Sequence, residues 1–568
     1  MRRLVRIAIL AMSTRAAVAS PPAADLVLLD GEVYTVDAAR SWASAVAVRD
    51  GRIVAVGTTR EVEPWIGAGT RVLRLAGKMV LPGFHDAHVH PVSGGVELGQ
   101  CDLNGAVDAA EALRRIETYA REHPGTSWIV GGGWDLPLFP DANPDKRALD
   151  ALLPDRPAIF SAADGHSAWV NSRALAAARI GAATPDPARG RIERDAHGEP
   201  SGTLREAAMD LVTDLVPEPT AEERVAGLAR AVSMAHRFGI TALHEASAGP
   251  EELAAYRTLD RRGELALHVR AALYVDPAKG VAQVAELEKL RAADWGPHVV
   301  AGAAKIFADG VIESGTAALL EPYLGPRGGR GELDWGSERF AEIATALDRA
   351  GFQIHVHAIG DRAIRVTLDS LAAARRANGP RDARPQIAHI QLFDPADLPR
   401  FRDLGVIANF QPLWAYADSY IRDLTEPVLG NARSRWLYPL GSMIATGAVV
   451  VGGSDWSVSS MNPLAAIEVA LTRRDPDSGP GPAWIPEERA DLATMIAAYT
   501  AAGAWADFGE RDFGSIEVGR AADLIVLDRN LFAIPADRIS ETKVLLTLFG
   551  GREVFRDPGL AGAEEAPR

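Results

Sequence analysis

Eight short apolar segments alternate with helix-like segments over most of the chain between residues 79 and 456. The helix-like segments include alanine-rich patterns such as ERFAEIATALDRAG at 338–351. Alternation of strand and helix is typical of parallel α/β architecture, and eight such units predict a closed (β/α)8 barrel. The eight predicted strands are 79–90, 239–246, 265–276, 298–310, 352–361, 385–393, 405–413 and 448–456.

Both ends of the chain predict short strands joined by turns. Residues 24–82 contain two Asp-Gly pairs, at 30–31 and 50–51, between apolar runs, which is a strong hairpin signal. The segments AADLIVLD and VLLTLFGGREVF near the other end have the same character. We therefore expect residues 24–82 and 511–558 to form one small composite β-sandwich.

The barrel is predicted over residues 83–510 and contains a large insertion. Residues 92–235 separate the first predicted barrel strand from the second, which is far more than an ordinary connection requires. The insertion has strand-like runs of its own, SWIVGGGWD and PAIFSAADGHS. We expect it to form a lid or subdomain over the mouth of the barrel.

The first 23 residues resemble a short export signal. An arginine-rich start precedes an apolar run at 7–12, and Ala-Val-Ala at 17–19 is similar to a small-residue cleavage site. Arg15 interrupts the apolar region, so a disordered leader stays an alternative. These features favour a periplasmic or secreted location over a cytoplasmic one. Residues 559–568, rich in Ala, Glu and Pro, predict a disordered tail.

Composition and charge exclude several classes of partner. The net charge of −15 argues against nucleic acid, because phosphate binding requires clustered Lys and Arg. No later stretch offers 18 uninterrupted apolar residues, so we expect no membrane span. The single cysteine, Cys101, cannot form an internal disulfide, so a metal site would use His, carboxylates and Lys. We expect a small-molecule substrate, and the sequence leaves a homodimer open.

Residues able to bind metal end five of the predicted barrel strands. In a barrel enzyme these ends converge on one mouth, where the catalytic groups lie. His88 and His90 are two apart, so both imidazoles point to the same side of a strand and form a bidentate claw for a metal such as zinc. An isolated HxH is weak evidence, but ligand-type residues also end four other strands: Lys305, His357, His389 and Asp455.

These motifs resemble a known family. The segment LPGFHDAHVH is similar to the opening metal motif of the amidohydrolase superfamily. Segments that resemble its YtcJ-like branch, amidohydrolase family 3, are GGGWDLPLFP, DGHSAWVNSRAL, AKIFADG, HAIGDRA, IAHIQLFDPADLPRF, GSDW and GSIEVGRAADLIVLD. They occur in this order, and together the motifs run from residue 81 to 528, so the resemblance covers most of the chain.

The resemblance implies a centre with one or two divalent ions. His88, His90 and Asp455 would hold the first ion, and His357 and His389 would hold the second. Zinc is the expected metal, with manganese, cobalt and iron as alternatives, because geometry and availability choose among them.

The resemblance further implies that Lys305 bridges the two ions as a carboxylated lysine, since an ammonium group has no lone pair for a metal. The alternative is a lysine paired with Asp309 or another acid, which would leave a single-metal site. A hydrogen-bonded core residue is the alternative for His389, and a helix cap is the alternative for Asp455. His355, two residues before a predicted ligand, is a second candidate that we place deeper or beside the ligands.

Such a centre predicts hydrolysis by a metal-activated hydroxide, since a divalent cation lowers the pKa of bound water to roughly 7 and polarises the scissile carbonyl. Asp455 would take the proton and pass it to the leaving nitrogen. The predicted reaction is cleavage of a non-peptide carbon–nitrogen bond in an amide, an N-formyl compound or a cyclic amide. The alternatives are hydrolysis of an ester, lactone or carbamate at the same site, and a non-catalytic metal-binding regulatory protein.

Five residues are predicted to contact the substrate. In the insertion, His166 is the candidate for a second catalytic group, and Trp134 and Asp135 lie in a motif resembling the YtcJ-like pattern. Glu245 ends the second predicted strand and Gln411 follows the seventh, so both are expected at the mouth. The alternative for His166 and Glu245 is a polar network that holds the structure together.

Overall fold

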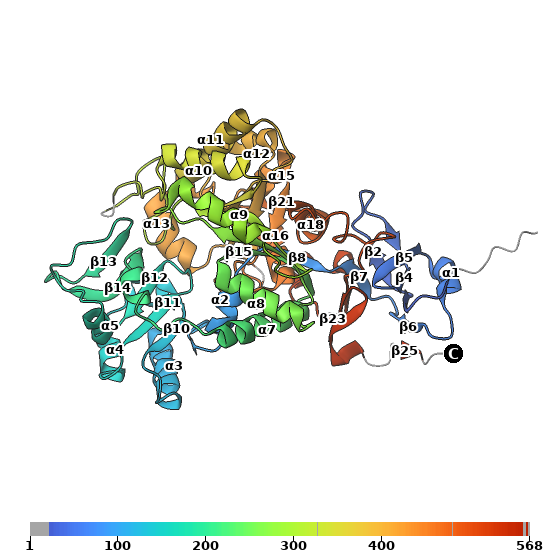
Figure 1. Cartoon of the computed structure of the whole chain (residues 1–568), viewed down its shortest axis with the longest axis horizontal. Coiled ribbons are helices and arrows are strands. Elements are labelled where there is room, and N and C mark those ends of the chain that lie inside the picture. Colours follow the sequence, from blue (N-terminus) through green and yellow to red (C-terminus); the bar gives the residue numbers. More distant parts are fainter. Residues whose placement is uncertain (1–21, 326–327, 480, 561–563, 566–568) are drawn as a thin grey trace, which may run out of the picture.

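Three parts of the molecule follow one another along its longest axis. Figure 1 shows the insertion on the left, the barrel in the centre and the strand-rich sandwich on the right. The computed structural model describes residues 22–325, 328–479, 481–560 and the backbone of 564–565, so the predicted leader lies almost wholly outside the described residues. None of the helices in these ranges is long and apolar enough to cross a membrane.

An eight-stranded parallel sheet forms the barrel, with its strands in chain order. Each predicted segment contributes one strand, so the prediction of a (β/α)8 barrel is confirmed. The first and last strands meet where the backbone N–H of Asp455 donates to the carbonyl oxygen of His88 over 2.7 Å. The strands are β8 Phe84–Val89, β15 Ile240–Ala248, β16 His268–Tyr274, β17 Val299–Phe307, β18 Gln353–Ala358, β19 Gln386–His389, β20 Ile407–Phe410 and β21 Val450–Gly452.

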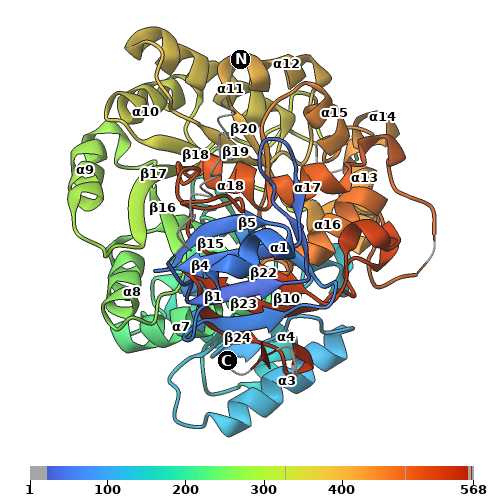
Figure 2. The same cartoon turned by 90° about the vertical axis from the view of Figure 1, so that its right-hand side faces the viewer.

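Helices cover the outside of this sheet, which Figure 2 shows from the sandwich end. They form because each presents one apolar face to the strands. In α7 (Ala221–Arg237), Leu228 and Val232 are buried, and a capping box between Thr220 and Glu223 starts the helix. The other longer helices around the barrel are α8 Pro250–Arg261, α9 Val284–Ala292, α10 Ser337–Arg349, α11 Asp361–Asn378 and α16 Pro463–Thr472.

The first predicted strand is divided between two sheets, which corrects the prediction of one barrel strand over 79–90. Met79–Pro82 form β7 in the sandwich, and the chain then enters β8 of the barrel. Gly83 lies at this passage, where a Cβ atom would overlap the side chain of Thr241. Glycine is therefore required by the close approach, and the sandwich and the barrel share one continuous segment.

The sandwich contains strands from both ends of the chain, as predicted. β7 pairs antiparallel with β22 (Leu524–Leu527), so that Pro82 lies opposite Leu524. Their sheet has the order β24-β23-β22-β7-β2-β3, and the second sheet has the order β25-β6-β1-β4-β5. The remaining strands are β1 Leu26–Leu29, β2 Glu32–Tyr34, β3 Trp42–Ala43, β4 Ala45–Arg49, β5 Arg52–Gly57, β6 Arg71–Arg74, β23 Val544–Phe549, β24 Arg552–Arg556 and β25 Glu564–Glu565. Pairing of β25 with edge strand β6 places two residues of the predicted disordered tail in a sheet.

The insertion forms a separate six-stranded sheet, and the chain then returns to the barrel through α7. Its core is built around buried aromatic side chains, among them Phe160 and Trp169. The turn between β11 and β12 faces the barrel mouth, because the ring of His166 lies 5.4 Å, centroid to centroid, from the ring of His357. The elements are β9 Cys101–Asp102, α3 Ala109–Glu122, β10 Ile129–Trp134, α4 Lys146–Leu152, β11 Ala158–Ala162, β12 Ser167–Val170, α5 Ser172–Ala177, β13 Gly190–Arg194 and β14 Pro200–Glu206.

We expect the composite sandwich to stabilise the whole protein. Deletion of residues 521–568 removes β22 and leaves β7 without its antiparallel partner, exposing apolar surface that the sandwich core buries. The melting temperature should fall well below that of the parent protein. Leu524→Ala, a fully buried position, should cost about 2–5 kcal/mol of unfolding free energy in a denaturant titration.

Val518→Ala is the matched control, because Val518 is 65% exposed in the segment just before β22. It should change the unfolding free energy by less than about 0.5 kcal/mol. A truncated protein that keeps the parent melting temperature would show that the sandwich is dispensable.

Candidate metal centre

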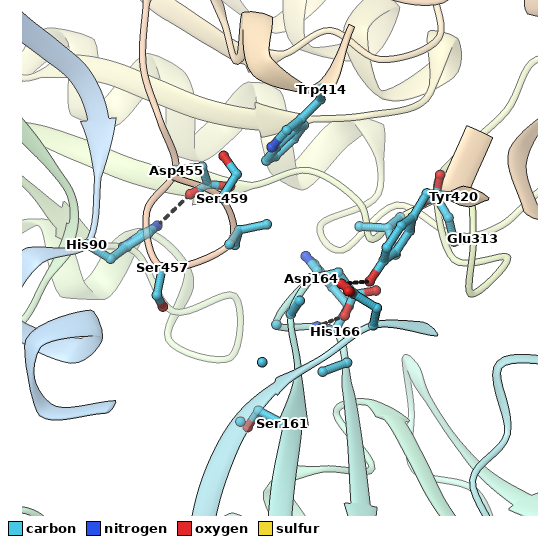
Figure 3. Close-up of a pocket in the computed structure, with 18 of the residues that line it drawn as sticks. His90, Ser161, Asp164, His166, Glu313, Trp414, Tyr420, Asp455, Ser457 and Ser459 are labelled. Carbon is cyan, nitrogen blue, oxygen red and sulfur yellow. Dashed lines mark hydrogen bonds and ion pairs between the residues drawn. The ribbon is translucent and has the colours of Figure 1, made fainter. Parts of the chain in front are cut away.

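Three ligand-type side chains converge where the first and last barrel strands end. His88 is the penultimate residue of β8, His90 follows the strand, and Asp455 lies in the loop after β21. One carboxylate oxygen of Asp455 lies 3.4 Å from Nε2 of His88 and 3.2 Å from Nε2 of His90. One donor atom from each residue lies within 4.8 Å of the others, and no other group of three metal-type residues does so in the described part of the chain. Figure 3 shows His90 and Asp455 at one side of the pocket.

Backbone conformation aims these ligands at the mouth. Asp455 has a φ of 53°, and His389 at the end of β19 has a φ of 78°. Such left-handed conformations are unfavourable for residues other than glycine and are concentrated at functional sites. Their occurrence at two predicted ligands shows that the strand ends bend to direct these side chains.

Two further histidines and a lysine lie beside the cluster. The rings of His357 and His389 are 4.6 Å apart, centroid to centroid, and Trp414 stacks on His389 with an angle of 8° between ring planes. Nζ of Lys305 lies 3.3 Å from Nε2 of His88. Lys305 is buried, and no ion pair with a carboxylate is found for it among the described residues. The alternative of pairing with Asp309 is therefore not seen.

The chemistry of this donor set fits a cation. Burial lowers the pKa of His88 and of His357 well below the usual range, and lowers that of His389 to about 3, so these imidazoles are neutral and keep a lone pair. Burial also opposes a charge on His90, but hydrogen bonds to Asp455 and Glu245 outweigh it and raise its pKa to about 9. A metal ion between His90 and the carboxylate would take the place of that proton.

Gln411 and Glu245, predicted substrate contacts, lie beside predicted ligands and are not among the described residues that line the cavity. The side-chain oxygen of Gln411 accepts a hydrogen bond from Nδ1 of His389 over 2.8 Å, which fixes the tautomer and leaves Nε2 unprotonated. Glu245 is 1% exposed, accepts a hydrogen bond from Tyr256 and lies 3.7 Å from Nδ1 of His90. Both side chains are buried beside the ligands.

Trp134, another predicted substrate contact, is not among the described residues that line the cavity. Its indole is fully buried in the core of the insertion, and its N–H donates to the carbonyl oxygen of Phe160 over 2.8 Å. The alternation of a strand places neighbours on opposite faces, so Trp134 at the end of β10 points inward. Asp135, the next residue, lines the cavity and accepts a hydrogen bond from Tyr420.

A cavity of about 590 Å³ joins the cluster to the insertion. His166 lines it from the insertion side, and its Nδ1 is bonded to the carboxylate of Glu206 over 2.9 Å. Burial opposes a charge on His166, but Glu206 and then Asp164 outweigh it and raise the pKa of His166 to about 9. The cavity is lined by all the predicted metal ligands together with Asp135 and His166.

Sequence reasoning missed most of the polar network beneath the ligands. Nε2 of His355 lies 2.8 Å from Nδ1 of His88, so the residue placed beside the ligands contacts one directly. Deeper in the barrel, Asp507 is bonded to both His85 and His244. The HVH pattern in β18 is a signal that could have indicated His355. Asp507 comes directly after a helix near the end of the barrel segment, and no regular sequence spacing relates it to the metal motifs.

Comparison with known proteins identifies the family. The amidohydrolase family model matches residues 71–555. The protein named "Putative amidohydrolase YtcJ" from Bacillus subtilis is 30% identical over 92% of this chain and 98% of its own length. N-substituted formamide deformylase from Arthrobacter pascens is 28% identical, with 93% of this chain and 97% of the relative covered.

The solved structures agree with this assignment. An uncharacterised metal-dependent hydrolase from Pyrococcus furiosus superposes with a TM-score of 0.68 at 25% identity, covering 89% of this chain and 99% of that chain. A divalent metal is therefore implied at the cluster of His88, His90 and Asp455. The barrel, the composite sandwich and the matches over most of the sequence lead to one assignment: the chain belongs to the amidohydrolase family and is a metal-dependent hydrolase.

Proposed function

We propose that the enzyme hydrolyses a small non-peptide carbon–nitrogen bond, in an amide, an N-formyl compound or a cyclic amide. The observation that carries the proposal is that two side chains face one cavity: the carboxylate of Asp455 from the barrel and the imidazole of His166 from the insertion. The printed name of the Arthrobacter relative, a deformylase of N-substituted formamides, supports a substrate of this class.

Two sets of residues would hold metal. His88, His90 and Asp455 form the tighter group and would hold the first ion. His357 and His389 would hold a second, with Lys305 joining the two if its buried amine is carboxylated. Zinc is the metal we propose, with manganese, cobalt and iron as alternatives. A bound divalent cation would supply a Lewis acid for the scissile carbonyl and lower the pKa of a water molecule to roughly 7.

Asp455 is placed to move the proton. One of its carboxylate oxygens faces Nε2 of both His88 and His90, and the other lies 3.9 Å from Nδ1 of His389. The second oxygen can accept the proton of the attacking water and return it to the leaving nitrogen, which departs poorly unless it is protonated.

His166 is placed to bind the carbonyl oxygen of the substrate. Because Nδ1 is held by Glu206, Nε2 is the nitrogen that can face the cavity. A donor aimed at the oxygen where negative charge develops stabilises the transition state more than the ground state. His166 thus acts from the insertion while Asp455 acts from the barrel.

Removal of metal should abolish the reaction. Treatment with a chelator should stop formate release from N-pentylformamide, and addition of Zn²⁺, Mn²⁺, Co²⁺ or Fe²⁺ to the depleted protein should restore it. Elemental analysis of the purified protein should find bound divalent metal. Full activity in a metal-free sample would exclude the proposed mechanism.

Asp455→Asn should lower kcat by roughly 10²–10⁴-fold, the usual contribution of general acid–base catalysis. Asn keeps the size and one ligating oxygen but cannot accept the proton, so at least part of the metal should stay bound. Calorimetry and elemental analysis on the same sample check folding and metal content. Asp477→Asn, at an exposed position, is the control for the change of charge. Parent activity in a metal-bearing Asp455→Asn protein would assign the proton transfer to another group.

His166→Gln should lower kcat by about 10²–10³-fold, the loss expected when one oxyanion donor is removed. The metal content should be unchanged, because His166 is outside the proposed ligand set. His197→Gln is the control, since His197 is exposed in the same insertion. Equal kcat in the His166 variant and the control would remove His166 from the reaction.

A further inference from the structure

The side of the cavity away from the metal centre is rich in carboxylates. Four carboxylates line the cavity besides Asp455 and the rim residue Glu97: Asp135, Asp164, Glu313 and Asp418. They come from segments far apart in sequence, after β10, between β11 and β12, after β17 and before the π-helix Tyr420–Thr425. Figure 3 shows Asp164, Glu313 and Tyr420 gathered at the side of the pocket away from His90 and Asp455.

Among the described residues that line the cavity there is no arginine, and the one lysine, Lys305, lies beside His88. Two of the carboxylates are hydrogen-bonded to neutral groups. Asp135 accepts from Tyr420, and Asp418 accepts from the backbone N–H of Ile421. These bonds satisfy oxygen atoms of Asp135 and Asp418 without supplying a positive charge.

Two cations, His166 and then Arg205, lower the pKa of Asp164, but each already has a counterion, and that of Arg205 is Glu193. Nδ1 of His166 is bonded to Glu206 over 2.9 Å, so that pair is close to neutral as a unit. Burial, with too little positive charge to offset it, raises the pKa of Asp164 and of Asp418 to about 6. A bound cation would relieve this cost.

One carboxylate oxygen of Asp164 has no hydrogen-bond partner among the described residues. Oδ1 accepts the backbone N–H of His166 over 2.9 Å, whereas Oδ2 is buried and has no hydrogen-bond partner among the described residues. Buried carboxylate oxygens are rarely left unpaired, because the loss of hydration is costly. Since Asp164 lines the cavity, the missing donor can come from a bound ligand.

The cation that fits here is organic and not a metal ion. Tyr416, Tyr420 and Trp414 line the cavity together with the carboxylates, and aromatic faces favour alkylammonium groups. The carboxylates are too dispersed for a metal, because His88, His90 and Asp455 are the only group of three close metal-type residues found in the described ranges. A primary ammonium has three donors, enough to join several such oxygens.

We propose that the substrate carries an ammonium group on the side of the scissile amide away from the metal centre, bound by Asp164, Asp418 and the adjoining aromatic rings. This inference rests on the proposed hydrolysis of a carbon–nitrogen bond and names the class of substrate that the same site accepts. The metal centre would bind the amide. Asp164 of the insertion, together with Asp418 and the aromatic rings of the segment after β20, would bind the charged arm, so both segments determine specificity.

The test compares two probes of equal length with the metal-loaded full chain. N-(4-aminobutyl)formamide ends in an ammonium group, and N-pentylformamide has a methyl group in its place. Formate release should give a kcat/KM at least about tenfold higher for the ammonium probe, the factor expected of one charge-assisted hydrogen bond. Isothermal calorimetry of the same two probes measures the preference in binding without turnover.

Two single variants and one double variant test which carboxylates cause the preference for the ammonium probe. Asp164→Asn and Asp418→Asn should each lower the ratio of kcat/KM between the two probes several-fold, and the double variant should bring it near one. Asn at 164 keeps the acceptor for the backbone N–H of His166. Asp155→Asn, at an exposed position in the same insertion, removes the same charge and should leave the ratio at its parent value.

The outcomes separate the two proposals. Equal kcat/KM and equal affinity for both probes, or a preference unchanged in the double variant, would overturn the assignment of an ammonium subsite. Formate release from neither probe, with tighter binding of the ammonium probe that the double variant loses, would refute N-formyl hydrolysis and support the subsite.

Discussion

Backbone hydrogen bonds between the ends of the first and last strands close the barrel and set the geometry of the metal centre. The N–H of Asp455 donates to the carbonyl oxygen of His88, and the N–H of His90 donates to the carbonyl oxygen of Trp456, so ligands from both ends of the barrel sheet are joined through the main chain. Asp86 reinforces the closure by accepting hydrogen bonds from the backbone N–H and the hydroxyl of Ser454, over 2.9 and 2.6 Å. The spacing of the ligands is thus fixed by the backbone and does not depend on side-chain rotamers alone.

The centre lies on a polar floor instead of the branched apolar layers that usually fill such barrels. His355 contacts His88 from below, and Asp507 bonds to His85 and His244 deeper in the barrel. Burial alone would raise the pKa of Asp507, but the two histidines outweigh it and lower the pKa. A buried carboxylate held by two partners resists displacement, because breaking either contact would leave a charge uncompensated. The ligand layer is therefore supported by groups that have little freedom to move.

The sequence predicted the barrel and the groups at its mouth because both follow from local pattern. Strand and helix periods are visible in single segments, and ligands at strand ends must meet once the sheet closes. Roles that depend on side-chain direction were harder to predict. Trp134 and Asp135 are adjacent, yet one fills a core and the other lines the cavity. Gln411 is at the mouth as expected, but it is hydrogen-bonded to His389 and is not among the described residues that line the cavity.

Residues brought together only by tertiary structure left no sequence signal at all. Asp507 and His85 belong to opposite ends of the barrel sequence, and Glu313 and Thr425 meet across the cavity wall through two loops. Their pairing depends on how the loops fold over the mouth, which no local period encodes. The division of the first predicted strand at Gly83 was equally invisible in the sequence, because it depends on the close approach of Gly83 to Thr241, which is distant in the chain.

The segment shared by the sandwich and the barrel also has a consequence for biogenesis. β7 is made early, but its partner β22 emerges only after the whole barrel, because Pro82 and Leu524 face each other across the ladder. At synthesis rates of about 5–20 residues per second, β7 lacks its partner β22 for tens of seconds after it is made. Contacts of such long range also make folding slow. During that interval the edge of β7 that β22 covers in the folded protein is open to pairing with other chains.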